Sequence, residues 1–316
     1  MIGKVDPDRL EAVFSRTGVT DADVRQGPAY GEDTAALRIG EELLVVNTDP
    51  VSLAAERIGT IGTHVACNDV AASGGEPRWL TVAIFLPDES SLDSIIDQLD
   101  AATHEIGVSI VGGHTEYAPE RERPLLSLTC LGLADEYIPT GGARPGDTLI
   151  LTKGAGMEGT AILATDFHDD VHLPEELLER GAALFSELNV LPEARILREY
   201  ASALHDPTEG GLVDGALELA VASDTLVRIE REHVPVREST EKLCGAMGVD
   251  PLKIFGSGAL LAAVPDENVE NALAELENKG IEAAAIGDVE TGDSALQLDD
   301  ERITAPVRDD LYELWT

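Results

Sequence analysis

The chain has 316 residues, of which 43% are hydrophobic and only 4% aromatic, so it can build two domains with mainly aliphatic cores. It carries 60 acidic and 22 basic residues, and this formal net charge of -38 argues against binding nucleic acid through a basic surface. No apolar run reaches the roughly 18–20 residues that span a membrane, and the N-terminus lacks a signal-peptide pattern, so we expect a cytoplasmic protein without membrane contact.

Hydrophobic periodicity in the first half predicts an α+β domain. We expect helices over residues 7–17, 58–72 and 90–106, and strands over 43–47, 79–86, 108–111 and 125–134. The helix over 58–72 has an apolar face that Asn68 and Asp69 continue, so their polar groups should face the sheet rather than solvent.

A segment rich in proline and glycine, residues 137–147, predicts a linker, and we place the domain boundary there, giving domains 1–138 and 139–316. The second half alternates strands and helices. Strands are expected over 148–152, 225–230, 258–264 and 282–289, and helices near 158–165, 174–188, 191–203, 212–222, 237–247 and 267–278.

Four aspartates stand at the edges of apolar elements: Asp33, Asp49, Asp69 and Asp206. A lone carboxylate is costly to bury unless it is paired or bound to a cation, and converging carboxylates repel one another. Carboxylate oxygens are ligands that Mg²⁺ prefers, usually together with substrate phosphate. The four aspartates therefore predict a magnesium site that serves the phosphates of ATP.

Two glycine pairs predict phosphate contacts. Gly112-Gly113-His114-Thr115 follows a short apolar strand, where backbone N–H groups and the Thr115 hydroxyl could meet a phosphate. His114 taken alone is more typical of a structural histidine.

The second pair lies in the segment from His205 to Gly211, His-Asp-Pro-Thr-Glu-Gly-Gly, which precedes a predicted helix. We expect Thr208 to cap that helix, and Gly210 and Gly211 to admit an anion at its N-terminus. Asp69, Asp206 and His205 are our predicted catalytic residues, with His205 or His114 as the proton carrier.

Two other patterns have structural explanations that we prefer. Residues 153–159 contain Gly-x-Gly-x-x-Gly between a strand and a helix, but the acidic residue expected about 20 positions later falls in a predicted helix rather than after a second strand. The histidines and aspartates of residues 168–172 lie in a polar segment, which is typical of a solvated loop.

These motifs, in this order, resemble the superfamily of aminoimidazole ribonucleotide (AIR) synthase, hydrogenase maturation factor HypE, selenophosphate synthetase and thiamine-monophosphate kinase. The HypE branch matches best, through Asn68-Asp69, residues 111–116, residues 144–147, residues 205–211 and residues 234–238. One position departs from that pattern, because Glu209 stands where the family usually has arginine.

The resemblance implies a two-domain, PurM-like α+β fold that forms a homodimer through its N-terminal sheets, with a C-terminal α/β domain. It also implies ATP between the domains, Mg²⁺ on Asp33, Asp49, Asp69 and Asp206, and phosphate contacts from Asn68, Gly112, Gly113, His114 and Thr115. HypE proteins end in a cysteine that carries their substrate group, whereas this sequence ends in Leu-Trp-Thr and its last cysteine is Cys244. We therefore expect an unidentified small-molecule or protein substrate.

We accordingly expect an ATP- and Mg²⁺-dependent enzyme that phosphorylates a substrate oxygen, of the amide or carbamoyl kind in AIR synthase and HypE. Two alternatives remain open: a regulatory or maturation protein that binds ATP without turning it over, and a small-molecule kinase resembling thiamine-monophosphate kinase. The even spread of acidic residues favours a halophilic host, since high salt screens their repulsion, over an acidic surface for a basic partner.

Overall fold

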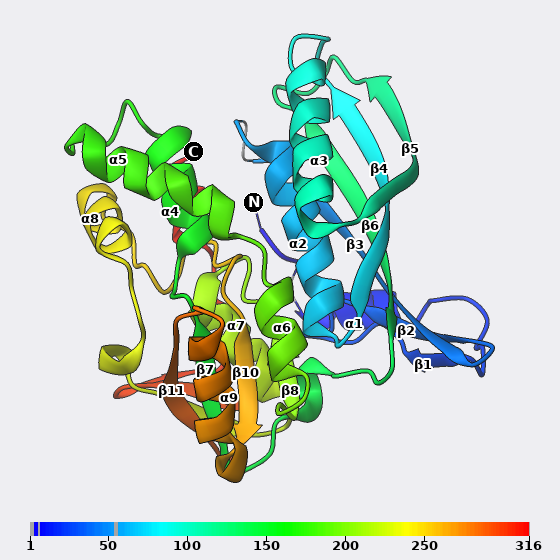
Figure 1. Ribbon diagram of the computed structural model, residues 1–316, viewed down its shortest axis with the longest axis vertical. Helices are drawn as coiled ribbons and strands as arrows, with labels where there is room; N and C mark the ends of the chain where they lie inside the picture. The colour runs from blue at the N-terminus through cyan, green and yellow to red at the C-terminus, as the bar shows by residue number, and fades with distance from the viewer. Residues whose placement is uncertain (1–2, 6, 54–55, 316) are drawn as a thin grey trace.

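Two β-sheets, each covered by helices, make up the two lobes of the computed structural model, which describes residues 3–5, 7–53 and 56–315 (Figure 1). Strands up to residue 134 form the first sheet and strands from residue 147 form the second. The predicted α+β fold class is confirmed. The boundary proposed at residues 138 and 139 falls in the connection between the sheets.

The first sheet has six strands in the order β1-β2-β3-β6-β4-β5, with α2 and α3 against one face (Figure 1). Its strands are β1 (Val24–Gln26), β2 (Ala35–Ile39), β3 (Glu42–Val51), β4 (Glu76–Leu86), β5 (Ser109–Tyr117) and β6 (Leu125–Ala134). The helices are α1 (Pro7–Phe14), α2 (Ile58–Ala72) and α3 (Leu92–Ile106). Alternate side chains of β6 are buried, as expected where one sheet face packs on helices.

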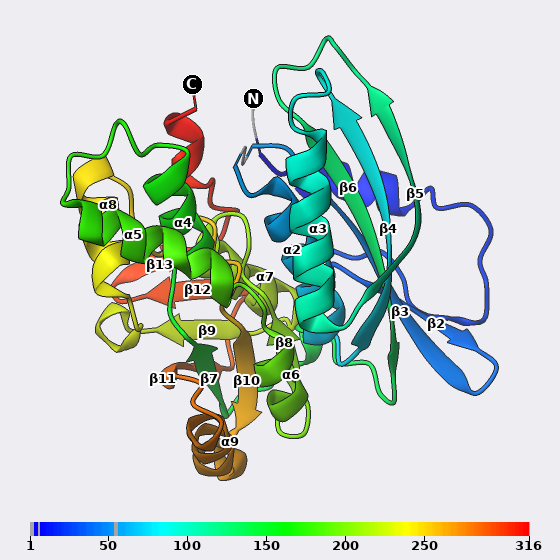
Figure 2. The same ribbon diagram turned by 45° about the horizontal axis from the view of Figure 1, so that its top comes forward.

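The second sheet has seven strands in the order β13-β12-β9-β11-β7-β10-β8 (Figure 2). The strands are β7 (Asp147–Thr152), β8 (Ala203–His205), β9 (Leu226–Ile229), β10 (Leu261–Pro265), β11 (Ala283–Glu290), β12 (Ala295–Leu298) and β13 (Glu301–Ile303). The helices are α4 (Met157–Thr165), α5 (Glu175–Ala182), α6 (Leu191–Leu197), α7 (Gly211–Ala222), α8 (Glu238–Met247) and α9 (Asp266–Asn278). Both neighbours of β7 run antiparallel to it, so the Gly-x-Gly-x-x-Gly after β7 is not in a Rossmann unit.

Several predicted elements differ from the structure. The helix over 58–72 and the strand over 125–134 have the predicted bounds, but β1, β2, β8, β12 and β13 were not predicted. Residues 112–115 lie inside β5, whereas we expected the strand to end before them. A helix was predicted over residues 191–203, but α6 ends at Leu197. Residue 203, the last of the predicted range, is the first residue of β8.

Helix α2 lies between the two lobes, which explains its unusual burial (Figure 1). It contacts α3, β3 and β6 of the first lobe, and also α6 and β8 of the second. Asn68 and Asp69 are 0% and 4% exposed, so the predicted burial of both is confirmed. Asp69 meets Asn47 of the sheet as predicted, whereas Asn68 faces the second lobe instead. Among the described residues, no helix has the length and apolar character needed to cross a membrane.

Candidate functional site

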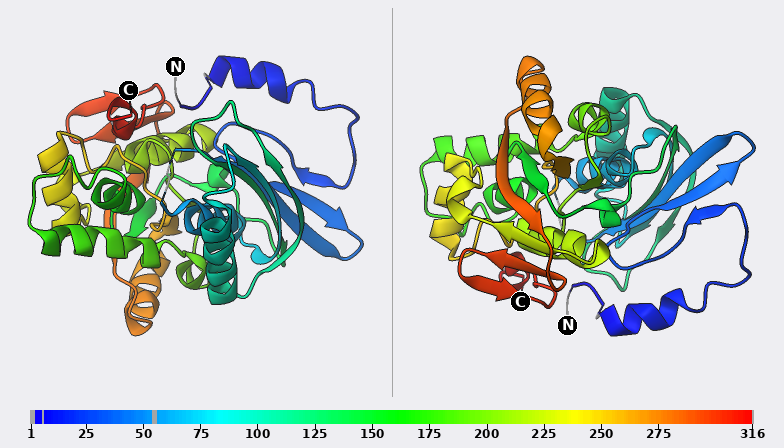
Figure 3. Two further views of the ribbon diagram at one scale, coloured as in Figure 1. Left: turned by 90° about the horizontal axis from the view of Figure 1, so that it is seen from above. Right: turned by 90° about the horizontal axis from the view of Figure 1, so that it is seen from below.

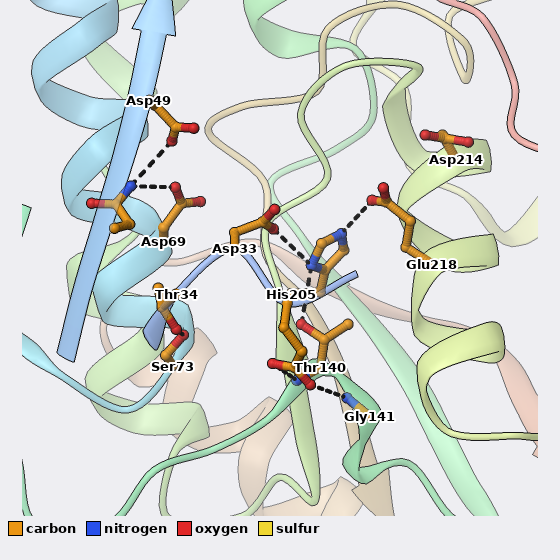
Figure 4. A network of polar contacts seen from close by, with 12 residues as sticks. Asp33, Thr34, Asp49, Asp69, Ser73, Thr140, Gly141, His205, Asp214 and Glu218 are labelled. Carbon is orange, nitrogen blue, oxygen red and sulfur yellow. Dashed lines mark hydrogen bonds and ion pairs between the residues drawn. The ribbon is translucent and has the colours of Figure 1, made fainter. Parts of the chain in front are cut away.

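Three of the four predicted metal aspartates converge where α2 meets the second lobe. Figure 4 shows two of them, Asp33 and Asp69. Asp33 precedes β2, Asp69 lies on α2, and Asp206 follows β8; each offers a carboxylate oxygen within 4.8 Å of the others. Asp69 and Asp206 are buried, and Asp206 Oδ2 has no hydrogen-bond partner among the described residues. An unpaired buried carboxylate oxygen of this kind is what a cation would satisfy.

The electrostatics of these carboxylates show the cost of bringing them together. Burial raises the pKa of Asp206 to about 7. Contact with Asp69 and the charge of His205 oppose this rise, whereas the charges of Asp33 and Asp49 add to it. Burial and the charges of Asp206 and Asp49 raise the pKa of Asp69 well above its usual value. Packing also raises the pKa of Asp33 to about 6, although 48% of its side chain is exposed. A hard cation with oxygen ligands, such as Mg²⁺, fits this set of donors.

Asn47 links the fourth predicted aspartate, Asp49, to this cluster, and the sequence did not indicate that it belongs to the site. Its Nδ2 donates to Asp49 Oδ2 at 3.1 Å and to Asp69 Oδ2 at 2.6 Å. The Cys130 backbone N–H donates to Asn47 Oδ1 at 3.3 Å, which fixes the amide orientation. Asn47 therefore positions two carboxylates at once, whereas direct metal ligation by Asp49 stays a prediction.

His205 is buried between acidic groups beside the cluster (Figure 4). Its Nε2 lies 3.1 Å from Glu218 Oε2, and its Nδ1 lies 3.7 Å from Asp33 Oδ2 and 3.4 Å from Thr140 Oγ1. Burial lowers the pKa of His205, but Glu218 and Asp33 more than offset this and raise it to about 9. The imidazole is thus a cation at neutral pH, and its predicted role as proton carrier remains a prediction.

Lys4, in the N-terminal segment, adds a second positive charge beside Glu218, the acid that His205 also contacts. Its ammonium lies 2.7 Å from Glu218 Oε1 and 3.3 Å from Asp214 Oδ2. Burial raises the pKa of Glu218, but Lys4 and His205 outweigh it and hold that pKa at about 2. Asp214 and Glu218 stand four residues apart on α7 among buried apolar side chains, and that spacing was a usable sequence signal.

A cavity of about 490 Å³ opens beside the aspartates. Residues from both lobes and from both ends of the chain line it. The ends meet at Glu209, because the Lys4 backbone N–H donates to Glu209 Oε1 at 2.8 Å and the same carboxylate is near enough to the Tyr312 hydroxyl to add to the rise in its pKa that burial causes. Figure 3 shows the two ends close together in views from above and below. Glu209 thus joins the termini at the cavity.

The glycines before α7 have a different role from the predicted one. A Cβ on Gly210 would lie 2.6 Å from the Val307 carbonyl oxygen, and one on Gly211 would lie 2.5 Å from the Ile254 carbonyl oxygen. The Gly210 N–H donates to Asp309 Oδ2 at 2.9 Å, so this N–H already has a partner within the protein. Phosphate binding by Gly210 and Gly211 therefore stays a prediction that this geometry does not support, because the close approach is by the protein's own backbone.

Thr208 also differs from expectation, because α7 has no side-chain cap and its N-cap residue is Gly210. Thr208 does line the cavity beside the aspartates, so a ligand contact by its side chain remains a prediction.

Asn68 has a structural role that the sequence did not indicate. Its Nδ2 donates to the Leu188 carbonyl at 2.8 Å, and its Oδ1 accepts from the Val190 N–H at 3.1 Å. Both polar atoms are therefore used in tying α2 to the second lobe. Phosphate binding by Asn68 stays a prediction that this geometry does not support, since both polar atoms of the amide are already hydrogen-bonded.

Residues 112–115 are not brought to the aspartates within this chain. They belong to the edge strand β5, and they line a separate cavity next to α3. A Cβ on Gly113 would lie 2.0 Å from the Val82 carbonyl oxygen, so packing against β4 already requires glycine there. His114 is exposed and pairs with Glu116 at 3.0 Å. Phosphate binding by Gly112, Gly113, His114 and Thr115 stays a prediction that this geometry does not support.

Comparison with known proteins places these features in a family. The model of the AIR synthase related protein N-terminal domain matches residues 31–134, and that of the C-terminal domain matches residues 144–299. Carbamoyl dehydratase HypE of Azotobacter vinelandii is 30% identical over 277 residues, covering 81% of this chain and 78% of the relative. Selenide, water dikinase of Citrifermentans bemidjiense is 30% identical over 322 residues, covering 91% and 92%.

Solved structures give the same picture. A hydrogenase maturation protein HypE superposes with a TM-score of 0.73 at 26% identity, covering 90% of this chain and 95% of the other. HypE in complex with ATP superposes with a TM-score of 0.68 at 24% identity, covering 94% of this chain and 90% of the other. AaThiL complexed with AMPPCP and TMP superposes with a TM-score of 0.76 at 20% identity, covering 96% of this chain and 95% of the other. The resemblance to HypE read from the motifs is confirmed, the named relatives are enzymes, and the chain belongs to the AIR synthase related protein family.

Proposed function

We propose that this protein is an ATP- and Mg²⁺-dependent enzyme that transfers a phosphoryl group to an oxygen of a second substrate, of the amide or carbamoyl kind. The observation that carries the proposal is the convergence of Asp33, Asp69 and Asp206 beside a cavity, with one buried carboxylate oxygen unpartnered. ATP complexes of HypE and a nucleotide-analogue complex of ThiL support ATP as the phosphoryl donor.

Each group near the cavity has a chemical role in this proposal. Asp33, Asp69 and Asp206 would hold Mg²⁺, and Asn47 would keep Asp49 and Asp69 oriented toward it. When bound, the metal would neutralise phosphate oxygens and orient them for in-line transfer. His205 would balance the acidic charge that remains.

The first test is calorimetry with ATP in molar KCl, with and without Mg²⁺, followed by phosphate release from the same samples. Wild-type protein should bind ATP only with Mg²⁺, and Asp69→Asn and Asp206→Asn should lose turnover while remaining folded. Asp97→Asn on the exposed face of α3 is the matched control. Full activity in both cluster variants would contradict the proposed site, and tight binding without turnover would favour the regulatory alternative.

We further propose a homodimer formed through the first sheet. The edge strand β5 is exposed along its length, and Ile110, Val111 and Tyr117 on it are 44%, 58% and 59% exposed. An edge strand with apolar side chains is a template for pairing with a second copy about a twofold axis. Light scattering after gel filtration should give twice the mass of 33.5 kDa, and Val111→Lys should give the monomer mass. A monomeric wild type would contradict the proposal.

The charge of -38 leads us to propose adaptation to high salt. Screening of this self-repulsion should make the thermal unfolding midpoint rise with KCl concentration.

A further inference from the structure

One wall of the cavity beside the aspartates is aromatic. Phe255, Tyr312 and Trp315 line it, although the chain has only five Phe, five Tyr and two Trp residues. Their ring centroids are 5.7 Å apart for Phe255 and Tyr312, 6.3 Å for Phe255 and Trp315, and 6.4 Å for Tyr312 and Trp315. We call these three residues the aromatic wall. Such a wall favours a flat apolar group.

Two buried polar side chains line the same cavity. Ser257 is 0% exposed, and its hydroxyl has no hydrogen-bond partner of normal geometry among the described residues. Glu158, at the start of α4, is 5% exposed, and burial raises the pKa of its carboxyl to about 7. The Ser257 hydroxyl is close enough to the Glu158 carboxyl to oppose this rise. The Glu158 carboxyl and the Ser257 hydroxyl thus form a buried polar pair on the cavity lining, and their remaining lone pairs can accept hydrogen bonds from a ligand.

The charges on the cavity lining restrict what this ligand is. The charged side chains that line it are five acids, Asp33, Asp49, Asp69, Glu158 and Glu209, and one base, Lys4. The Lys4 ammonium is already paired with Glu218 and Asp214. An anionic group would therefore meet no free cation of the described lining and would be repelled by Glu158 and Glu209. A group with N–H donors would instead find acceptors there.

We propose that the cavity binds the second substrate by a flat apolar group that carries an amine or amidine. Its N–H groups would donate to Glu158 and Ser257, and its flat face would lie on the aromatic wall. A cation near aromatic rings is attracted by their negative faces, in addition to the charged hydrogen bonds. This inference rests on the proposed function, because the aspartates beside the cavity would serve the phosphoryl donor.

Three fragments of nearly equal shape test the charge preference: benzamidine, benzamide and benzoate. Their dissociation constants would be measured by calorimetry in molar KCl, with Mg²⁺ and with or without a non-hydrolysable ATP analogue. We expect benzamidine to bind at least about tenfold more tightly than benzoate, which corresponds to 1.4 kcal/mol, with benzamide between them. Equal or tighter binding of benzoate, or no benzamidine binding, would overturn the proposal.

Variants then locate the interaction. Glu158→Gln should weaken benzamidine binding about tenfold and reduce its preference over benzoate, whereas Glu277→Gln on the exposed side of α9 should change neither. If Glu158→Gln does not fold, Ser257→Ala carries the same test. Unchanged benzamidine binding in the folded variant would contradict the assignment.

The ATP titration on the same samples separates this inference from the proposed function. If the wild-type protein does not bind ATP in the presence of Mg²⁺, the proposed function is contradicted. The fragment affinities would still test the charge preference of the cavity. Normal ATP binding together with a benzoate preference would contradict only the substrate inference.

Discussion

Replacing Asp206 with asparagine should stabilise the metal-free protein while removing its response to Mg²⁺. The pKa of Asp206 is about 7 in the folded protein against 3.8 for the free side chain, chiefly because the group is buried. Each pH unit of that difference corresponds to about 1.36 kcal/mol, so ionising Asp206 at about pH 8 costs up to roughly 4 kcal/mol. Burying the asparagine amide costs about 1–3 kcal/mol in return, which leaves a net gain of about 1–3 kcal/mol.

The pH dependence of this gain gives the reasoning a second check. A carboxyl whose folded pKa is raised costs nothing below its unfolded pKa, and the cost grows until the pH passes the folded value. For Asp206 the window runs from pH 3.8 to about 7. At about pH 5 the cost is therefore less than half of its value at pH 8, and the advantage of Asp206→Asn should shrink accordingly.

Denaturant unfolding of the two proteins in molar KCl and a metal chelator measures the difference directly. Asp97→Asn, an exposed change on α3, controls for the loss of one negative charge from the whole molecule. If Asp206→Asn is less stable than wild type at about pH 8, or if its gain does not fall toward pH 5, the carboxylates are not in electrostatic conflict. A Mg²⁺-induced rise in its unfolding midpoint equal to that of wild type would contradict its role as a ligand.

Three further outcomes follow from the same contacts. Mg²⁺ should raise the thermal midpoint of wild-type protein more above pH 7 than below pH 6, because Asp33 and Asp206, with pKa values of about 6 and 7, must lose their protons to bind it; equal shifts would contradict this. Asn68→Ala leaves two buried backbone groups unpaired and should lower the free energy of unfolding by about 2–5 kcal/mol in denaturant titrations, and a loss below about 1 kcal/mol would refute the tie between the lobes. Asn47→Ala should weaken Mg²⁺ binding about 10–100-fold by calorimetry with little loss of secondary structure, and unchanged affinity would remove Asn47 from the site.

The sequence predicted the parts of the site that depend on local pattern. Ile58, Ile61 and Val65 recur at three- and four-residue spacing in α2, and extending that pattern placed Asn68 and Asp69 away from solvent. The structure buries both, although it buries nearly all of α2 rather than one face. The high cost of burying a carboxylate then singled out Asp69 and Asp206, which the structure does bury. Because a cation shared by several carboxylates would offset that cost, the sequence also predicted that Asp69 and Asp206 lie close to Asp33.

The parts that the sequence could not settle depend on long-range contacts. Glycine permits close approach of any backbone, and the sequence alone cannot distinguish a phosphate from a neighbouring strand or loop. For Gly113 the neighbour is Val82, and for Gly211 it is Ile254, each more than 30 positions away in the chain. Glu158 and Asn47 were missed for a related reason, since only the folded cavity shows which isolated polar residues face it.

The contrast between Asn68 and Asp69 shows how the fold tolerates an unfavourable cluster. Adjacent on α2, one is neutral and fully hydrogen-bonded to the second lobe, and the other is an acid with a raised pKa. Lys153 holds the same segment within the second lobe, because its ammonium donates to the Glu187 and Asn189 carbonyls and pairs with Glu193 at 2.7 Å. The contact between the lobes therefore rests partly on the amide of Asn68, which does not titrate, while the aspartates stay close together. A cation that relieves their repulsion would gain affinity from this arrangement, since the lobes do not have to be brought together when it binds.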